Sequence, residues 1–196
     1  SWQDLVNAVN ETIERNAERM NRIVGDLLEL SRIEAPGYSP TRAPFALPSL
    51  VEEVRLALAQ SLETRTQRLV VDIDEDAVSF LADRDAISRI LVNLMDNAIK
   101  YSPDGMDITV TARSEGDSIS IEVIDCGPGV PEADRPRLFE RFYRVDRGRS
   151  REMGGTGLGL SIVKHLAESH GGSAHYEPNL PSGSRVIVRI PQTPDS

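Results

Sequence analysis

The chain has 196 residues, of which 39% are hydrophobic and 27% charged, a composition typical of a globular protein with one or two domains. Its net charge of −9 argues against a general binder of nucleic acid or anionic membrane, because the summed negative charge repels both. The single cysteine, Cys126, excludes an internal disulfide and suits a reducing compartment. There is no signal peptide and no apolar run of the about 20 residues that cross a bilayer, so we expect any membrane anchor to lie outside this chain.

Residues 11–34 are predicted to form one amphipathic helix, with residues 1–10 as a connecting loop. Apolar residues recur at alternating spacings of four and three, which is a coiled-coil-like seam: Ile13, Ala17, Met20, Val24 and Leu27. Other apolar residues widen this seam toward the face of a helix in a bundle: Ile23, Leu28, Leu30 and Ile33. The face could pack on the chain's own domain or on a partner helix that is not in this chain.

A proline-rich segment favours the partner helix. Residues 35–48 contain four prolines and a glycine, which break any continuous helix and mark a domain boundary. We therefore divide the chain into residues 1–35, part of a helical domain, residues 36–46, a linker, and residues 47–192, a second domain.

From residue 47 onward, helical and strand patterns are mixed. Helices are predicted at residues 47–62, 85–100 and 157–170. Strands are predicted at residues 68–74, 77–82, 106–114, 118–127 and 183–191. Alternation places one set of apolar residues on a single face: Ile108, Val110, Ile119, Ile121, Val123, Val186, Val188 and Ile190. The separate blocks of helices and hairpin strands predict an α/β sandwich with a helical layer on one face of a mixed, largely antiparallel sheet.

The sequence NLMDNAIKY, residues 93–101, interrupts an apolar helix with two amides and an ammonium group. At about 100° per residue, Asn93, Asn97 and Lys100 fall directly beside the apolar arc, at the rim of the expected core. Such a rim can line a cleft, because amide oxygens suit a hard divalent cation and an ammonium suits phosphate. The competing interpretation is that these are ordinary polar residues at a helix boundary.

Two glycine-rich segments favour the cleft. In DCGPGV, residues 125–130, Gly127 and Gly129 would let the backbone approach a ligand, and Asp125 offers a carboxylate to an exocyclic amine. Taken alone, this segment could also be a simple turn after a strand. In GGTGLGLSIVK, residues 154–164, glycines run directly into an amphipathic helix, so that backbone N–H groups would point at an anion. The second segment is neither a Walker loop nor a convincing dinucleotide fingerprint.

Four motifs in this order, NLMDNAIKYS, DCGPGV, RLFERFYR and GGTGLGLSIVK, resemble the asparagine, first glycine, phenylalanine and second glycine motifs of sensor histidine kinases. The resemblance covers residues 11–190, because RMNRIVGDLLELSRIE is also similar to the second helix of that family's dimerisation and phosphoacceptor domain. It implies a GHKL-type ATP-binding fold, shared with gyrase, heat-shock and mismatch-repair ATPases.

The resemblance implies a role for each motif residue in binding ATP and Mg²⁺. Asn97 would coordinate Mg²⁺, and Asn93 and Lys100 would lie near the metal and the phosphates. Tyr101 would stack on adenine, and Asp125 would accept a hydrogen bond from its N6 amine. Backbone contacts to the nucleotide would come from both glycine motifs: Gly127, Gly129, Gly157, Leu158, Gly159 and Leu160.

The arginine-rich segment between the two glycine motifs, residues 127–153, would be the ATP lid. It has few apolar residues and no clear period. Seven arginines lie between residues 135 and 151, and the resemblance gives only Arg144 a phosphate contact, with the γ-phosphate. Phe139 and Phe142 would pack within the lid or against the helical domain.

The residue at position 93 indicates which reaction follows. The related ATPases hold a water-activating glutamate four residues before the metal-binding asparagine, where this chain has Asn93. A neutral amide is no general base at neutral pH, so direct hydrolysis should be slow and the γ-phosphate should go to another nucleophile. The family's acceptor motif, similar to H-E-L-R-T-P, is absent. The three histidines, His165, His170 and His175, are expected at the surface or at a helix end.

The resemblance therefore implies the catalytic domain of a histidine kinase, which phosphorylates a histidine on a helix missing from this chain. The partners would be ATP or ADP, that acceptor helix in a homodimer, and a response regulator, with no nucleic acid and no direct membrane contact. The chain would be the cytoplasmic domain of a membrane-anchored bacterial sensor. Two alternatives are a GHKL-family regulatory ATPase or protein-serine kinase, which would lack the helix ending in SRIE, and a purely structural interaction module.

Overall fold

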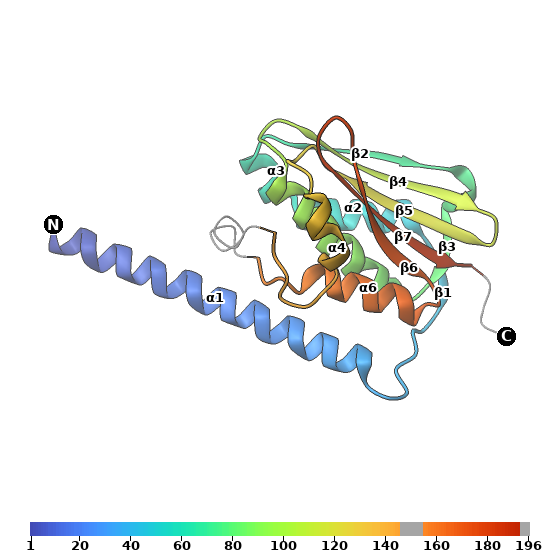
Figure 1. Cartoon of the computed structure of the whole chain (residues 1–196), viewed down its shortest axis with the longest axis horizontal. Coiled ribbons are helices and arrows are strands. Elements are labelled where there is room, and N and C mark those ends of the chain that lie inside the picture. Colours follow the sequence, from blue (N-terminus) through green and yellow to red (C-terminus); the bar gives the residue numbers. More distant parts are fainter. Residues whose placement is uncertain (146–154, 193–196) are drawn as a thin grey trace.

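The computed structural model of the chain describes residues 1–145 and 155–192. Its first element is the helix α1, Trp2–Glu34, which runs away from the rest of the molecule as a long arm (Figure 1). The expectation of a loop at residues 1–10 is wrong. Ser1 caps the helix: its side chain accepts a hydrogen bond from the Asp4 N–H at 3.3 Å, and the Asp4 carboxylate accepts one in return from the chain's amino group.

The segment after α1 contains a strand that was not predicted, because its prolines are typical of a linker. Strand β1, Ala43–Ala46, pairs antiparallel with β3, Ser79–Ala82, in a small separate sheet. Pro44 is tolerated because this sheet has only two strands, both of them edges. The single helix expected at residues 47–62 is divided at Leu58 into α2, Leu47–Ala57, and α3, Ala59–Thr64.

Five strands form the main sheet, in the order β2-β4-β5-β7-β6. The pair β2–β4 is parallel and the other three pairs are antiparallel, which confirms the expected mixed, largely antiparallel sheet. Strand β6 was not predicted, because its sequence SAHYEP lacks a run of β-branched residues. The strand bounds are β2 Arg68–Ile73, β4 Asp107–Glu115, β5 Ser118–Ile124, β6 Ser173–Pro178 and β7 Ser184–Pro191.

Helices cover one face of this sheet, as predicted (Figure 1). Two of them carry the motifs, α4 at Arg84–Tyr101 and α6 at Gly159–Ser169, and they pack against each other. Two short 3-10 helices lie at Glu75–Ala77 and Glu132–Arg137. Cross-strand register brings the apolar residues to the helical layer, with Val110 opposite Val123 and Ile121 opposite Val188. The apolar faces of helices and strands thus meet in one core.

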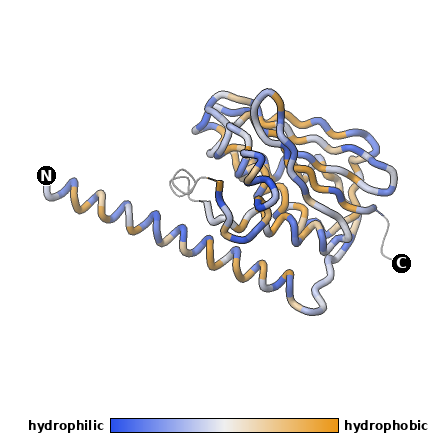
Figure 2. The backbone as a smooth tube through the Cα atoms, viewed as in Figure 1, coloured by the Kyte–Doolittle hydropathy of each residue, from blue (hydrophilic) through white to orange (hydrophobic). Residues whose placement is uncertain are grey.

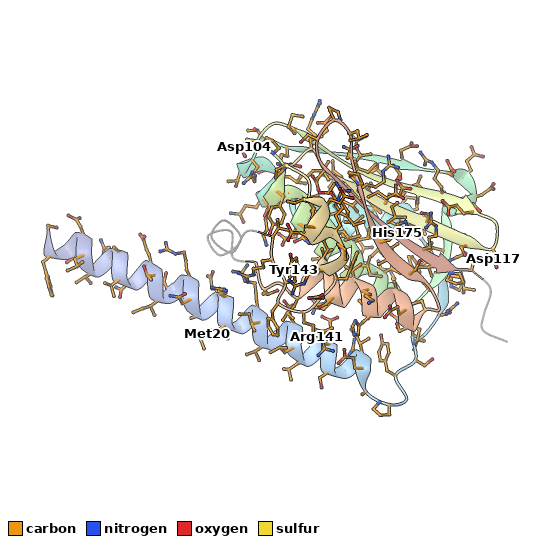
Figure 3. The ribbon with its side chains drawn as sticks, in the orientation of Figure 1. Met20, Asp104, Asp117, Arg141, Tyr143 and His175 are labelled. Atoms are coloured by element: carbon orange, nitrogen blue, oxygen red, sulfur yellow. The ribbon has the colours of Figure 1, made fainter. Side chains whose placement is uncertain are left out.

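Among the described residues, helix α1 contacts the domain through its C-terminal half, where it lies along α6 (Figure 1). Leu30 and Ile33 are buried there, so the last turns do pack on the chain's own domain. Hydrophobic residues continue along the helix to its N-terminal end (Figure 2), and Met20 points away from the domain (Figure 3). Most of the predicted seam is exposed: Ile13, Met20, Val24, Leu27 and Leu28. Within residues 1–145 and 155–192, no helix is long and apolar enough to cross a membrane.

Candidate nucleotide site

The polar residues of α4 lie at the rim of the core, where the helical wheel places them. Asp83 caps this helix, its Oδ1 accepting from the N–H groups of Asp85 and Ala86 at 3.1 and 3.2 Å. Asn93 and Asn97 are partly exposed beside a fully apolar face. That face contains Ala86, Ile87, Ile90, Leu91, Leu94, Met95, Ala98 and Ile99. The capped, well-packed helix holds the two amides in fixed positions.

The amide of Asn93 has a defined orientation. Its Nδ2 donates to the carbonyl of Arg89 at 2.9 Å, and its Oδ1 faces the first residue of α6. This oxygen lies 2.8 Å from the point that a Cβ on Gly159 would occupy, so a larger residue at the start of α6 would require the Asn93 side chain to move. Within the described part of the chain, Asn97 makes no side-chain hydrogen bond. Two amide oxygens therefore remain available to a ligand.

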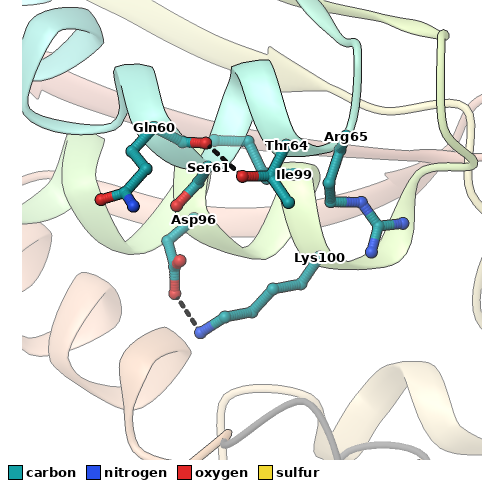
Figure 4. Close-up of a pocket in the computed structure, with 7 residues that line it drawn as sticks. All are labelled: Gln60, Ser61, Thr64, Arg65, Asp96, Ile99 and Lys100. Atoms are coloured by element: carbon teal, nitrogen blue, oxygen red, sulfur yellow. Dashed lines mark hydrogen bonds and ion pairs between the residues drawn. The ribbon is translucent and has the colours of Figure 1, made fainter.

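Lys100 lies at the end of the same helix and pairs with Asp96, one turn earlier (Figure 4). It borders two hollows in the surface. A cavity of about 280 Å³ between α3 and α4 is lined by Gln60, Ser61, Thr64, Arg65, Asp96, Ile99 and Lys100. A larger cavity of about 440 Å³ is lined by Arg65, Lys100, Tyr101, Ser102, Pro103, Cys126, Gly127, Pro128 and Ser182.

The larger cavity joins the two motifs that the sequence singled out. Tyr101 from the end of α4 and Gly127 from the turn after β5 both line it. The Tyr101 side chain is 37% exposed, so one face of its ring can be covered by a ligand. A Cβ on Gly127 would lie 2.7 Å from the Tyr101 carbonyl oxygen, which shows that glycine here permits contact with the end of α4. The sequence had assigned this glycine to contact with a ligand instead.

Asp125 is the buried carboxylate next to this cavity. Its Oδ1 accepts two backbone hydrogen bonds, from Gly127 at 2.8 Å and from Ser184 at 3.1 Å. Burial raises the pKa of this carboxyl above its ordinary value, and hydrogen bonds from the two N–H groups and from the Ser184 side chain partly offset that rise. Both backbone hydrogen bonds within the described residues go to Oδ1 and none goes to Oδ2. One oxygen therefore fixes the side chain, and the other is left to accept from a ligand.

The second glycine motif lies against the first part of the lid. Gly157 has φ +76°, and its carbonyl accepts from the Phe142 N–H at 2.8 Å. Leu158 is fully buried in the core, so only its backbone can face a nucleotide, and Leu160 is partly buried beside it. Gly129 also has a positive φ, +72°, and abuts the backbone of Gly183.

In this structure Arg144 reaches the second glycine motif, with Nη2 donating to the carbonyl of Gly155. Phe142, which was expected to pack, is 56% exposed and has a positive φ of 62°. The rest of the predicted lid, residues 146–154, lies outside the described residues. The phosphate contact assigned to Arg144 would require its side chain to leave the Gly155 carbonyl.

The structure adds residues that the motifs did not indicate. Ser184 supports Asp125 from β7, and Ser182 donates to the Gly127 carbonyl at 2.6 Å. Thr156 joins the second glycine motif to α1, with Oγ1 donating to Asp26 Oδ2 at 2.8 Å. Arg65 borders both cavities. The hydroxyl of Thr156, between two glycines, is a signal that could have been read from sequence; the others depend on tertiary contacts.

Of the two positions expected for the histidines, surface or helix end, His170 occupies the second. It follows the last turn of α6, and its side chain is fully buried, which the sequence did not predict. His165 and His175 are partly exposed. Within residues 1–145 and 155–192, no group of three or more His, Cys, Asp or Glu side chains could hold a metal ion. A divalent cation at this site would therefore rest on amide oxygens and on oxygens of its ligand.

Comparisons with known proteins agree with the geometry. Residues 82–194 match the family model described as histidine kinase-, DNA gyrase B- and HSP90-like ATPase. The sensor-like histidine kinase SenX3 of Mycolicibacterium smegmatis is 36% identical over 195 residues, which cover 98% of this chain and 50% of that protein. The chain thus spans about half the length of this curated relative, and a smaller share of others.

Two solved structures share the fold. Full-length ShkA in complex with AMPPNP superposes with a TM-score of 0.79 and 26% identity, over 92% of this chain and 37% of that one. Histidine kinase ThkA in complex with the response regulator TrrA superposes with a TM-score of 0.75 and 26% identity, over 93% and 50%. The resemblance to sensor histidine kinases that the motifs indicated is confirmed.

Proposed function

Because the chain belongs to the family of histidine kinase-, DNA gyrase B- and HSP90-like ATPases, we propose that it binds Mg-ATP and directs the γ-phosphate to a histidine. One observation carries this proposal: the asparagine helix and the first glycine motif meet at a cavity of about 440 Å³ next to a buried carboxylate. ShkA, which has the same fold, is in complex with AMPPNP.

We assign the adenine to the cavity beside Tyr101 and Gly127. The exposed Tyr101 ring offers a face for stacking, and Asp125 Oδ2 offers an acceptor to the N6 amine. The phosphates would extend past Lys100 toward the start of α6. There, the first N–H groups of α6 favour negative charge, and Gly157 and Gly159 would present backbone to the phosphates once Arg144 and the Asn93 amide turn toward the ligand.

The donor set near the phosphates suits Mg²⁺. Asn97, whose side chain makes no hydrogen bond within the described part of the chain, and Asn93, whose Oδ1 faces the start of α6, offer amide oxygens of the kind that hard cations prefer. The ion would supply charge neutralisation on the phosphates. Lys100 would leave Asp96 to meet the phosphates as a second positive charge, and Arg144 would leave the Gly155 carbonyl to meet the γ-phosphate.

This site lacks the group needed to activate water. Position 93, where the related ATPases hold a water-activating glutamate, has a neutral amide in this chain. A general base must accept a proton, which an amide does not do at neutral pH. We therefore assign the γ-phosphate to a histidine on another helix and infer a subsequent transfer to an aspartate of a response regulator. ThkA, a relative in fold, is in complex with such a regulator.

We also infer that the acceptor helix reaches this site in a homodimer. The exposed apolar seam on α1 supports this, because an apolar stripe of that length is normally covered. The relatives are longer and are named as sensors, so we place this chain as the cytoplasmic part of a membrane-anchored bacterial sensor.

The variant Asn97→Ala tests the site. It should weaken the binding of ADP in the presence of Mg²⁺ by about tenfold or more and leave binding in EDTA unchanged, because only the metal contact is lost. Isothermal titration calorimetry measures both affinities, and circular dichroism checks that the domain stays folded. Asn16→Ala, the same change on the exposed surface of α1, is the matched control. Equal Mg-ADP affinity in the Asn97 variant and the control would remove Asn97 from the metal site.

A further inference from the structure

His170 is the most buried ionisable side chain outside the nucleotide cavity, with 0% of its surface exposed. Its Nδ1 lies 2.8 Å from the Leu166 carbonyl and its Nε2 lies 3.1 Å from the backbone N of Asp83. A carbonyl can only accept and an N–H can only donate. Nδ1 must therefore carry the proton and Nε2 must be a bare acceptor, so His170 is held as one neutral tautomer.

Asp83 and His170 join opposite ends of the two motif helices. Asp83 caps the start of α4, and His170 caps the end of α6, so the two helices run antiparallel. At their other meeting point, Asn93 Oδ1 abuts Gly159, the first residue of α6. From Asp83 to Asn93 is about 15 Å along α4, and from Gly159 to His170 is about 16 Å along α6. The two helical segments therefore match in length, with the Asp83–His170 contact at one end of the α4–α6 interface and the Asn93–Gly159 contact at the other.

We propose that His170 is a positioning residue that fixes the longitudinal register of α6 against α4, and with it the spacing between the asparagine motif and the second glycine motif. Helices that pack through apolar side chains alone can shift along each other at modest cost, because dispersion contacts carry little directional preference. A buried hydrogen bond at one end removes that freedom, since sliding would leave the Asp83 N–H and the His170 Nε2 unpaired inside the protein.

The same joint includes the segment that leads from α1. The Thr41 N–H donates to Asp83 Oδ2 at 3.0 Å, and Arg42 Nη2 donates to the His170 carbonyl. In the described part of the chain, Arg42 and Asp83 are the charged groups that face His170, Arg42 from the linker and Asp83 from the start of α4. Burial, with Arg42 nearby, lowers the pKa of His170 below its ordinary value, which favours the neutral tautomer. Protonation would place a second N–H against that of Asp83.

This proposal rests on the proposed nucleotide site. Two substitutions distinguish the roles of the two ring nitrogens of His170. In His170→Gln the amide oxygen can replace Nε2 as the acceptor for Asp83. In His170→Asn the shorter side chain can replace only Nδ1, as donor to Leu166. Titration calorimetry with Mg-ADP at pH 7.5 should show the Gln variant within about twofold of the unsubstituted chain and the Asn variant about three- to tenfold weaker, the effect of one hydrogen bond.

The pH profile distinguishes positioning from simple packing. Between pH 7.5 and pH 5.5 the unsubstituted chain should lose affinity for Mg-ADP relative to His170→Gln, whose side chain does not titrate. Taking the ratio of the two chains at each pH cancels protonation of the nucleotide and of other groups. A constant ratio, together with equal affinity of the Asn and Gln variants, would overturn the proposal.

A third measurement uses the unsubstituted chain without nucleotide. It tests the proposal even if a variant does not fold or if the chain does not bind ADP. In the ¹⁵N NMR spectrum His170 should show the Nδ1–H tautomer, and the side-chain amide signals of Asn93 and Asn97 should shift with the His170 titration. Amide signals that stay constant while His170 titrates would overturn the proposal whether or not ADP binds. Absence of Mg-ADP binding to the unsubstituted chain, with coupled NMR titration, would overturn only the nucleotide site.

Discussion

At the scale of single residues, we expect Asp125 to determine whether the cavity prefers adenine or guanine. Its two oxygens have different surroundings: within the described residues Oδ1 accepts backbone hydrogen bonds from Gly127 and Ser184, and Oδ2 accepts none from the backbone. A purine with an exocyclic amine at position 6 matches an acceptor, whereas a carbonyl at that position would face the carboxylate unfavourably. We therefore expect Oδ2 to distinguish the two purines, while the backbone bonds to Oδ1 hold the side chain in place.

Asp125→Asn should therefore reduce the preference for adenine over guanine. The Asn Oδ1 can keep both backbone hydrogen bonds while Nδ2 replaces the free acceptor by a donor. We expect the ratio of GDP to ADP dissociation constants to fall by about tenfold or more, since a mismatched buried polar pair costs about 1–3 kcal/mol. Calorimetry with both nucleotides measures the ratio. Asp76→Asn, an exposed aspartate, is the control, and an unchanged ratio would exclude Asp125 from base recognition.

The raised pKa of Asp125 also predicts how stability depends on pH. Because the folded pKa lies above the unfolded value, the folded state binds the proton more tightly, and stability from this group is lost as the pH rises through the folded pKa. At pH 7 the ionised carboxylate is therefore a cost that Asp125→Asn removes. The variant should melt at or above the temperature of the unsubstituted chain at pH 7, with the difference shrinking as the pH approaches 4. A variant that melts well below it at pH 7 would contradict this.

At the scale of elements, acidic side chains join α1 to three parts of the domain. Asp26 accepts from Thr156 of the second glycine motif, and Glu29 pairs with Arg89 of α4. Glu34 pairs with His165 of α6 at 2.6 Å and with Arg141 of the predicted lid, which Figure 3 shows beside α1. Helix α1 thus touches α4, α6 and the second glycine motif, elements that we propose hold the nucleotide.

Glu34→Gln should loosen the end of α1. It removes the charge that pairs with both His165 and Arg141, and partly exposed pairs of this kind contribute up to about 1 kcal/mol. Hydrogen exchange of the last turn of α1 should become a few-fold faster, and added salt should reduce the difference because it screens the original pairs. Glu14→Gln, an exposed glutamate on the same helix, is the control. Equal exchange in both variants would show that Leu30 and Ile33 alone hold the contact.

The lid is the element expected to respond to nucleotide. In its described part, residues 131–140 make short-range backbone hydrogen bonds, such as Asp134 N–H to Pro131 and Leu138 N–H to Arg135. Long-range bonds lie at the two ends, Val130 N–H to the Tyr176 hydroxyl and Phe142 N–H to the Gly157 carbonyl. A segment held mainly at its ends opens at a lower free-energy cost than the strands of the core. Amides of residues 127–145 should exchange rapidly without nucleotide and more slowly with Mg-ATP. Equal protection in both states would indicate a fixed loop and would count against a phosphate contact by Arg144.

At the scale of the whole molecule, the chain has residues suited to hold ATP but no recognisable acceptor for its phosphate. Incubated with radiolabelled ATP and Mg²⁺, it should bind nucleotide, hydrolyse it slowly and acquire little or no phosphate, because position 93 offers no general base. Supplied with the preceding helix in one chain, it should place an acid-labile phosphate on a histidine of that helix. Brisk hydrolysis by the chain alone, or an upstream helix without histidine, would favour an ATPase instead.

Sequence periodicity was sufficient to predict the helices and strands that have one buried and one exposed face. The apolar faces of α4, β4, β5 and β7 were predicted, because a half-buried helix or strand shows its inner face directly in its spacing. The motif residues of the candidate site were also identified, since glycines, amides and a lysine interrupt that spacing. Strands β1 and β6 were missed, because Pro44 and the sequence SAHYEP carry no such pattern and become strands only by pairing with β3 and β7.

The sequence by itself determined the type of each long element and the family, and it supplied the residues to which we assign nucleotide binding. Only the tertiary structure decided what those residues contact: Gly127 meets the Tyr101 carbonyl, Lys100 meets Asp96 and Arg144 meets Gly155. His170 shows the reason. Its position at a helix end was readable, but its burial depends on Asp83, 87 residues away in the chain, and on Arg42, 128 residues away. The spacing of apolar residues in the sequence indicates which face of a helix or strand is buried. It does not indicate which polar group, distant in the chain, will form a hydrogen bond there.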